Sequence, residues 1–160
     1  MKFKKRLKQL QSILDLDTVP EISINYKVRP NQKRKIAMGE DMAEFAQSLF
    51  EDGDFDLRER FVVILLDHEL NPVGFFNHTI GAMDSVDVDR RMIFQKLILV
   101  GGARFVVAHN HPQSPPLPSK EDVEATFYLK HQAEFLDLEL VDHIILSREG
   151  YYSFNEQDMI

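Results

Sequence analysis

Two short apolar runs limit the folds open to this chain more than any other feature. Arg60 to Asp67 reads RFVVILLD, and Ala103 to His111 reads ARFVVAHNH. Both runs are rich in branched apolar residues and lack a polar face, which is typical of central strands covered on both sides. We therefore expect a sheet whose two faces are both covered.

The segments around these runs supply the covering layers. They show apolar residues at three- and four-residue steps, or alternate between apolar and polar residues up to a turn. The sequence predicts further helices at 3–14, 40–50, 86–100 and 119–136 and further strands at 22–28, 73–81, 138–146 and 151–154. In the helix at 119–136 we expect Val123, Phe127 and Leu129 to face the core. This order predicts an α/β fold, a three-layer sandwich around a mixed central sheet.

Length and composition narrow the class of protein. At 160 residues the chain is expected to form one domain, 36–160, preceded by a basic helix and arm at 1–35. Without cysteine it has no disulfide, thiolate metal site or cysteine nucleophile. No run has the length of a signal-peptide core or a membrane span, so we expect a cytoplasmic protein that does not enter a membrane.

Charge divides the chain unevenly. Residues 1–35 hold ten Lys and Arg against three Asp and Glu, whereas the rest holds nine against twenty-three. An acidic domain is a poor general binder of phosphate backbones, but the basic arm leaves a weak contact with nucleic acid open. The commoner role of such a run is a solvated helix face and linker. The apolar stripe of the first helix would also allow a homodimer.

The second apolar run ends in a group of potential metal ligands. Side chains alternate across a strand, so His109 and His111 project to the same side. A proline-rich loop then returns the chain to a helix that carries Asp122 in its first turn. Ser119 and Asp122 also have the spacing of an ordinary helix capping box. Two imidazoles, a carboxylate and a fourth position for water are typical of a catalytic Zn²⁺ site, in which the pKa of the bound water falls to ~7.

The motif as a whole resembles that of a known family. The string HNHP, with Ser119 and Asp122 after the loop, resembles the metal motif of the JAMM (MPN+) proteins, and in particular of their bacterial RadC branch. The strings RERFVVILLD, ARFVVAHNHP, LVDHIIL and GYYSF extend the resemblance over about residues 40 to 160.

The resemblance implies the cytidine-deaminase-like JAMM architecture and a zinc-dependent hydrolase of peptide or isopeptide bonds. His109, His111 and Asp122 would be the metal ligands. Glu59, directly before the first buried strand, would act as general base on the zinc-bound water, and Ser119 would supply the oxyanion contact. The expected substrate is a peptide or protein.

The chain departs from the usual RadC pattern in three places. Asp89 to Met92 reads DRRM where HPRE is common, so no glutamate acts there. The loop reads HPQS in place of HPSG, with Ser114 where a glycine is usual. The first 35 residues are too short for the helix-hairpin-helix segment of longer RadC proteins. We therefore expect a short, stand-alone RadC-like protein.

A second function from another class stays open. The domain would then be a binding or scaffold module without proteolytic activity, linked to DNA repair or replication through its basic arm. The string His109 to His111 does not indicate an HNH nuclease, because the three residues of that site come from separate parts of its fold.

The remaining histidines are expected to have structural roles. His143 follows Asp142 on an apolar strand, and such a pair can orient a metal ligand. A buried core histidine with satisfied hydrogen bonds is the commoner case, and it is what we expect here. No special function is expected for His68, His78 or His131, which lie by turns or on an amphipathic helix.

Overall fold

The computed structural model describes residues 36, 38–50, 55–80 and 89–160. The helix and strand expected at 3–14 and 22–28 lie outside these residues, so the division at residue 35 stays a prediction. The described elements are α2 (Glu40–Ser48), β1 (Arg60–Leu66), β2 (Pro72–Ile80), α3 (Arg90–Leu99), β3 (Arg104–Asn110), α4 (Lys120–Phe135), β4 (Glu139–Ser147) and β5 (Gly150–Ser153). Their order agrees with that expected from the sequence.

The strands form one mixed sheet. Its order is β2-β1-β3-β4-β5. The β1–β2, β1–β3 and β4–β5 pairs are antiparallel, whereas β3 and β4 run parallel and are connected through α4. The two apolar runs therefore occupy adjacent inner strands, and every residue of β1 is buried.

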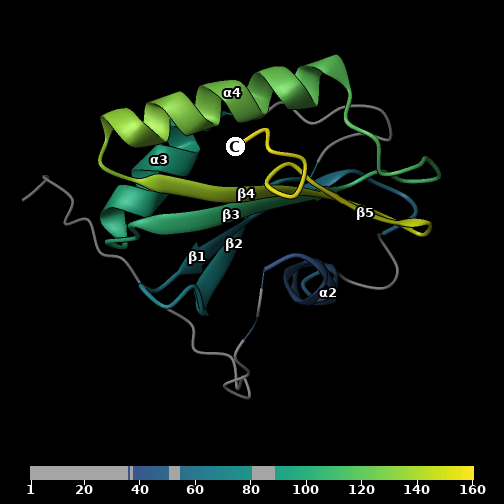
Figure 1. Ribbon diagram of the computed structural model, residues 1–160, viewed down its shortest axis with the longest axis horizontal. Coiled ribbons are helices and arrows are strands. Elements are labelled where there is room, and N and C mark those ends of the chain that lie inside the picture. Colours follow the sequence, from purple (N-terminus) through teal and green to yellow (C-terminus); the bar gives the residue numbers. More distant parts are fainter. Residues whose placement is uncertain (1–35, 37, 51–54, 81–88) are drawn as a thin grey trace, which may run out of the picture. The chain divides into compact units, whose positions relative to one another are not determined.

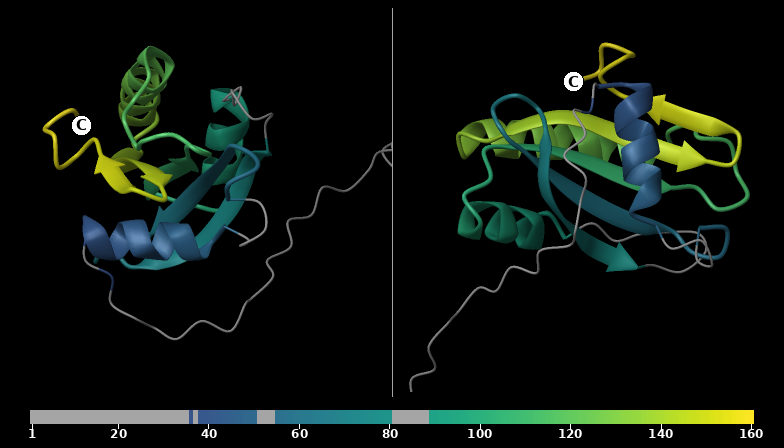
Figure 2. Two further views of the ribbon diagram at one scale, coloured as in Figure 1. Left: turned by 90° about the vertical axis from the view of Figure 1, so that its right-hand side faces the viewer. Right: turned by 90° about the horizontal axis from the view of Figure 1, so that it is seen from below.

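Helices cover both faces of this sheet, as Figures 1 and 2 show. Alternate residues of β1 divide between two apolar clusters. One cluster packs α2 on the sheet and includes Val62, Ile64 and Leu66 from β1. The other packs α3 and α4 on the opposite face and includes Phe61, Val63 and Leu65. The three-layer sandwich around a mixed sheet is thereby confirmed.

Side chains fix where the two helices of the second cluster begin. Asp89 is the N-cap of α3 and accepts a hydrogen bond from the Met92 backbone N–H at 3.3 Å. The segment that departs from the HPRE pattern is thus a helix start. Ser119 caps α4 in a capping box with Asp122. Both caps satisfy backbone donors that a helix leaves without an internal partner.

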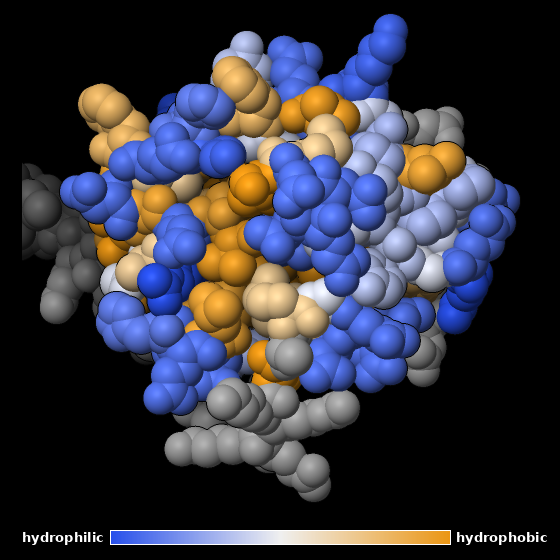
Figure 3. Space-filling model, viewed as in Figure 1, coloured by the Kyte–Doolittle hydropathy of each residue, from blue (hydrophilic) through white to orange (hydrophobic). Residues whose placement is uncertain are grey.

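The core face of α4 differs from the expected one. Leu129 is buried, but Val123 and Phe127 are 38% and 56% exposed, so the prediction that they face the core is wrong. The buried face of α4 holds Thr126, Leu129 and Ala133. Periodicity could not separate the two faces, because apolar residues lie on both. Figure 3 shows apolar side chains interrupting the hydrophilic surface at the top of the view, where α4 lies.

Within the described part of the chain, no helix combines the length and the apolar character needed to cross a membrane.

Candidate metal centre

Strand pairing brings Glu59 and the two histidines to one end of the sheet. Phe61 in β1 lies opposite His109 in β3. Glu59 precedes Phe61 by two residues and His111 follows His109 by two, so the alternation of an antiparallel pair places all four on one face. This is the face on which α3 and α4 pack.

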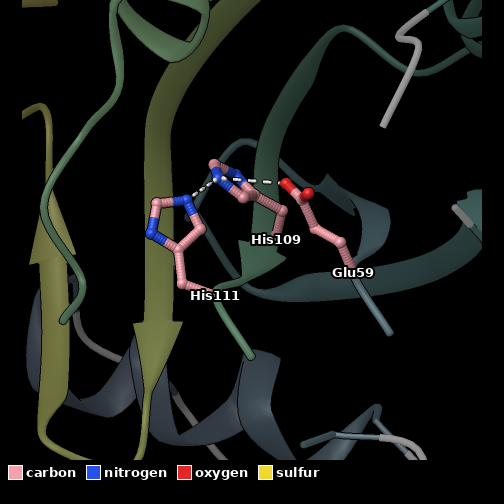
Figure 4. A group of neighbouring side chains, drawn as sticks. All are labelled: Glu59, His109 and His111. Carbon is pink, nitrogen blue, oxygen red and sulfur yellow. Dashed lines mark hydrogen bonds and ion pairs between the residues drawn. The ribbon is translucent and has the colours of Figure 1, made fainter. Parts of the chain in front are cut away.

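The side chains of Glu59, His109 and His111 point toward one another (Figure 4). One ligand atom from each lies within 4.8 Å of the other two, so these residues form a group that could hold a metal ion. The Nε2 atoms of the histidines are 3.1 Å apart. Glu59 Oε1 lies 3.9 Å from His109 Nε2. His109 is fully buried, whereas the side chains of Glu59 and His111 remain 14% and 17% exposed, so water can reach the group.

Asp122 approaches the same histidines from α4. Its Oδ1 lies 3.1 Å from His109 Nε2, and its Oδ2 lies 3.6 Å from His111 Nε2. Oδ2 also accepts hydrogen bonds from the backbone N–H and the hydroxyl of Ser119, at 2.8 and 2.6 Å. The helix cap therefore holds Asp122 with its other oxygen turned to His109. Of the two carboxylates, Asp122 lies closer to the histidines than Glu59.

The charges of this cluster support one another. Burial by itself raises the pKa of Asp122, but hydrogen bonds from His109 and His111 outweigh it and hold the pKa far below its usual range. The hydrogen bond with Asp122 in turn raises the pKa of His111 above 6.5. Asp122 is thus held as an anion, and its negative charge stabilises the protonated form of His111.

The donor atoms fit a tetrahedral ion in type and spacing. Zinc bonds of ~2.05 Å in a tetrahedron place neighbouring ligand atoms about 3.3 Å apart. His109 Nε2 lies 3.1 Å from both His111 Nε2 and Asp122 Oδ1, and the second oxygen of Asp122, Oδ2, lies 3.6 Å from His111 Nε2. Two imidazole nitrogens and a carboxylate suit zinc and other borderline metals better than calcium or magnesium, which prefer oxygen alone.

The far nitrogen of each histidine has a partner of its own. His111 Nδ1 lies 3.2 Å from the Pro115 carbonyl oxygen. His109 Nδ1 lies 2.8 Å from His143 Nε2. Because each Nδ1 is engaged, both histidines present Nε2 to the cluster.

His143 lies in the core as expected, but it also contacts a potential metal ligand. The residue is fully buried, as a core histidine would be, but its ring contacts His109. Asp142 does not orient this ring through its carboxylate, which accepts from the Ser153 hydroxyl and the Asn155 backbone N–H. Burial raises the pKa of Asp142 and lowers the pKa of His143 well below 6.5.

An irregularity in β4 explains why sequence reasoning missed this contact. Leu140 pairs with Phe105, but Asp142 pairs with the next residue, Val106, so Val141 is an extra residue in β4. A bulge of this kind exchanges the faces of the residues that follow it. His143 therefore lies on the face of His109, where a regular strand would have placed it on the other.

Asn110 is a second residue that sequence reasoning missed. It lies on the opposite face of β3 from the histidines and is fully buried. Its Oδ1 accepts from the Arg60 backbone N–H at 2.8 Å, and its Nδ2 donates to the carbonyls of Phe55 and Arg58 at 2.6 and 2.9 Å. The backbone on both sides of Glu59 is thus tied to β3. The sequence did offer a signal for this role, because Asn110 is a polar residue between two potential ligands at the end of a run expected to be buried.

Comparison with known proteins supplies a family match. A family model described as "RadC-like JAB domain" matches residues 36–159. A UPF0758 protein of Thermotoga maritima is 43% identical over 100 residues, which are 62% of this chain and 45% of that protein. One of Coprothermobacter proteolyticus is 29% identical over 143 residues, 89% of this chain and 53% of that protein. The chain spans about half the length of these curated relatives.

Proposed function

The chain belongs to the RadC-like JAB domain family, and from this premise we propose that it is a zinc-dependent metallohydrolase that cleaves a peptide, isopeptide or related amide bond. One observation carries the proposal. His109 Nε2 is approached by Asp122, His111 and Glu59, at 3.1, 3.1 and 3.9 Å, from three separate segments of the chain. Such a convergence is typical of a metal site with a carboxylate beside it.

His109, His111 and Asp122 are the proposed ligands. When bound, zinc lowers the pKa of a water molecule to ~7 and polarises the carbonyl group of a substrate. Asp122 is preferred to Glu59 as the third ligand because it is closer to both imidazoles and because its second oxygen is fixed by Ser119. A carboxylate whose pKa lies far below its usual range is ionised at every physiological pH, as a ligand must be.

Glu59 is the proposed general base. It would take a proton from the attacking water as the oxygen bonds to the carbonyl carbon, and would give that proton to the nitrogen as the carbon–nitrogen bond breaks. Its distance of 3.9 Å from His109 Nε2 leaves it beside the ligands. Asn110 supports this role, since its hydrogen bonds to Arg58 and Arg60 keep the Glu59 backbone in place.

Ser119 is the proposed oxyanion donor. In the structure its hydroxyl donates to Asp122 Oδ2 at 2.6 Å and accepts from the Asp122 backbone N–H at 3.1 Å. To stabilise the negative oxygen of a tetrahedral intermediate, the hydroxyl proton has to turn from Asp122 to the substrate. The Ser119 backbone N–H would keep its bond to Asp122 during this change.

Glu59→Gln tests this function directly. The substitution keeps the size of the side chain and removes its basicity. With a panel of quenched fluorescent peptides and isopeptide-linked lysines as substrates, we expect the variant to bind zinc as the wild type does and to lose at least ~100-fold in kcat. Activity that persists in Glu59→Gln would exclude Glu59 as the base.

The scaffold alternative depends on residues 1–35, which lie outside the described residues. It predicts DNA binding with a steep salt dependence that is lost when these residues are deleted. A zinc-loaded wild type inactive on the whole substrate panel, together with such binding, would favour the alternative over the hydrolase.

A further inference from the structure

We infer that Thr126 and His143 form a relay that holds a proton on His109 Nδ1 and so turns the lone pair of His109 Nε2 to the metal. The inference rests on the proposed zinc site and adds two positioning residues to it. It follows from the donor and acceptor capacity of each group in the relay.

Thr126 sets the direction of the relay. It is 3% exposed and lies one helical turn after Asp122. Its hydroxyl oxygen is 2.6 Å from the Asp122 carbonyl oxygen and 2.6 Å from His143 Nδ1. A carbonyl can only accept, and a hydroxyl has a single hydrogen to give. Thr126 therefore donates to Asp122, and His143 Nδ1–H donates to Thr126.

His143 passes this direction on to His109. With its proton on Nδ1, a second proton on Nε2 would put a net charge on a fully buried ring. His143 Nε2 is therefore the acceptor of the 2.8 Å contact, and His109 Nδ1–H is the donor. His109 thus holds a proton on Nδ1, away from the cluster, and a proton that its Nε2 shares with Asp122 in the metal-free protein is the one that a metal would replace.

Ring packing fixes the planes of the two imidazoles. His143 stacks on Phe154 with ring centroids 4.9 Å apart and planes at 9°. Phe61 lies parallel to His109, at 6.0 Å and 8°. A half-turn of either ring about its Cβ–Cγ bond would keep the stacking but would put a ring carbon where a nitrogen now contacts Thr126 or the other imidazole, so the hydrogen bonds select the present orientation.

The relay begins and ends at Asp122. The Asp122 carbonyl anchors Thr126, and the Asp122 carboxylate lies 3.1 Å from His109 Nε2, the atom that the relay orients. A ligand from α4 and a ligand from β3 are thereby aligned through His143 in β4. His111 needs no relay, because a backbone carbonyl at Pro115 fixes its proton on Nδ1.

Thr126→Val tests the relay with little change of shape. It removes the hydroxyl, so His143 Nδ1–H loses its acceptor. Loss of the hydrogen-bond partner of a ligating histidine typically weakens metal binding ~10–100-fold. Thr126 acts one hydrogen bond further out, through His143, so we expect zinc affinity to fall by about 10-fold, the lower end of that range. Thr126→Ser keeps the hydroxyl and should stay close to the wild type. Leu129→Val is the matched control, because it trims a buried side chain on the same face of α4 and has no part in the relay.

The tautomer of His143 gives a readout that does not depend on metal. Long-range ¹H–¹⁵N spectra of metal-free protein labelled at histidine distinguish Nδ1–H from Nε2–H, and His143→Phe identifies the His143 signals. We expect the Nδ1–H form in the wild type, in Thr126→Ser and in Leu129→Val. In Thr126→Val the proton should move to Nε2 or exchange between the two nitrogens.

The outcomes separate this inference from the proposed function. If the wild type binds no zinc, the proposed function fails, and the tautomer of His143 alone decides the relay. A proton on His143 Nε2 in the wild type overturns the relay in either case. So does a Thr126→Val variant that binds zinc as tightly as the wild type, or no more weakly than Leu129→Val. Weaker binding in Thr126→Val alone, together with a changed tautomer, supports it.

Discussion

Asn110 Oδ1 accepts a hydrogen bond from the backbone N–H of Arg60 at 2.8 Å, which joins the residue between the two histidines to the residue directly after Glu59. The ligand strand and the segment of the proposed base are therefore held together from the face of the sheet opposite the cluster. Displacement of one would displace the other.

Asn110→Ala should affect both stability and activity. It leaves the Arg60 N–H and two backbone carbonyls without their partner, and an unsatisfied buried group costs ~1–3 kcal/mol. Urea unfolding measures this loss. If the hydrogen bonds of Asn110 position Glu59, kcat should fall in folded Asn110→Ala while zinc affinity changes little. An equal loss in kcat and in zinc affinity would mean that Asn110 supports the whole site and not Glu59 alone.

Asp122→Asn should weaken zinc binding by at least the ~10–100-fold seen when an outer partner of a ligand is lost, because a charged ligand is replaced by a neutral one. Calorimetric titration with zinc measures the change. Ser119→Ala removes the cap and the hydroxyl that holds Asp122 Oδ2: it should cost ~1 kcal/mol of stability and weaken zinc binding less than Asp122→Asn, because the backbone N–H at position 119 keeps its bond to the carboxylate. Unchanged affinity in Asp122→Asn would favour Glu59 as the third ligand.

Zinc affinity should fall as the pH falls. Asp122 raises the pKa of His111 above 6.5, so a proton competes with zinc for His111 at a higher pH than it would for an unperturbed histidine. The same shift stabilises the metal-free fold fully below pH 6.5, and this contribution is lost as the pH rises through the folded-state pKa of His111. The difference between the melting temperature with zinc and that with chelator should therefore grow as the pH rises from 6 to 8. Parallel curves would contradict the prediction.

The two faces of α4 should respond differently to truncation. Leu129 is fully buried, so Leu129→Ala should cost ~2–5 kcal/mol. Phe127 is 56% exposed, so Phe127→Ala should cost less than ~1 kcal/mol in spite of the larger side chain. Chemical denaturation of both variants checks the order. A larger loss for Phe127→Ala would mean that another surface covers this face.

Features of the molecule that local pattern fixes could be predicted from the sequence. Continuous apolar runs identified β1 and β3 as inner strands, and the spacing from His109 to Asp122 pointed to a metal site. The contact of His143 with His109 depends on the extra residue at Val141. Residue types and spacing do not reveal a bulge, because it arises from the pairing of two strands far apart in sequence.

The face of α4 that packs on the sheet was equally beyond local pattern. Val123 and Phe127 are apolar, but which stripe meets the sheet is decided by how the loop after His111 directs the helix. Asp122 fixes that direction in part, because its carboxylate contacts His109 and His111. The orientation of the first turn of α4 then sets which of the later residues face the sheet. A contact between distant residues thus overrode the expectation from periodicity.

Zinc stoichiometry of the purified protein tests the central claim most directly. After incubation with zinc at neutral pH and removal of the excess, we expect about one equivalent per chain in the wild type. In a variant with both His109→Ala and His111→Ala, less than about a tenth should remain. A wild type that retains less than about a tenth of an equivalent would contradict the account.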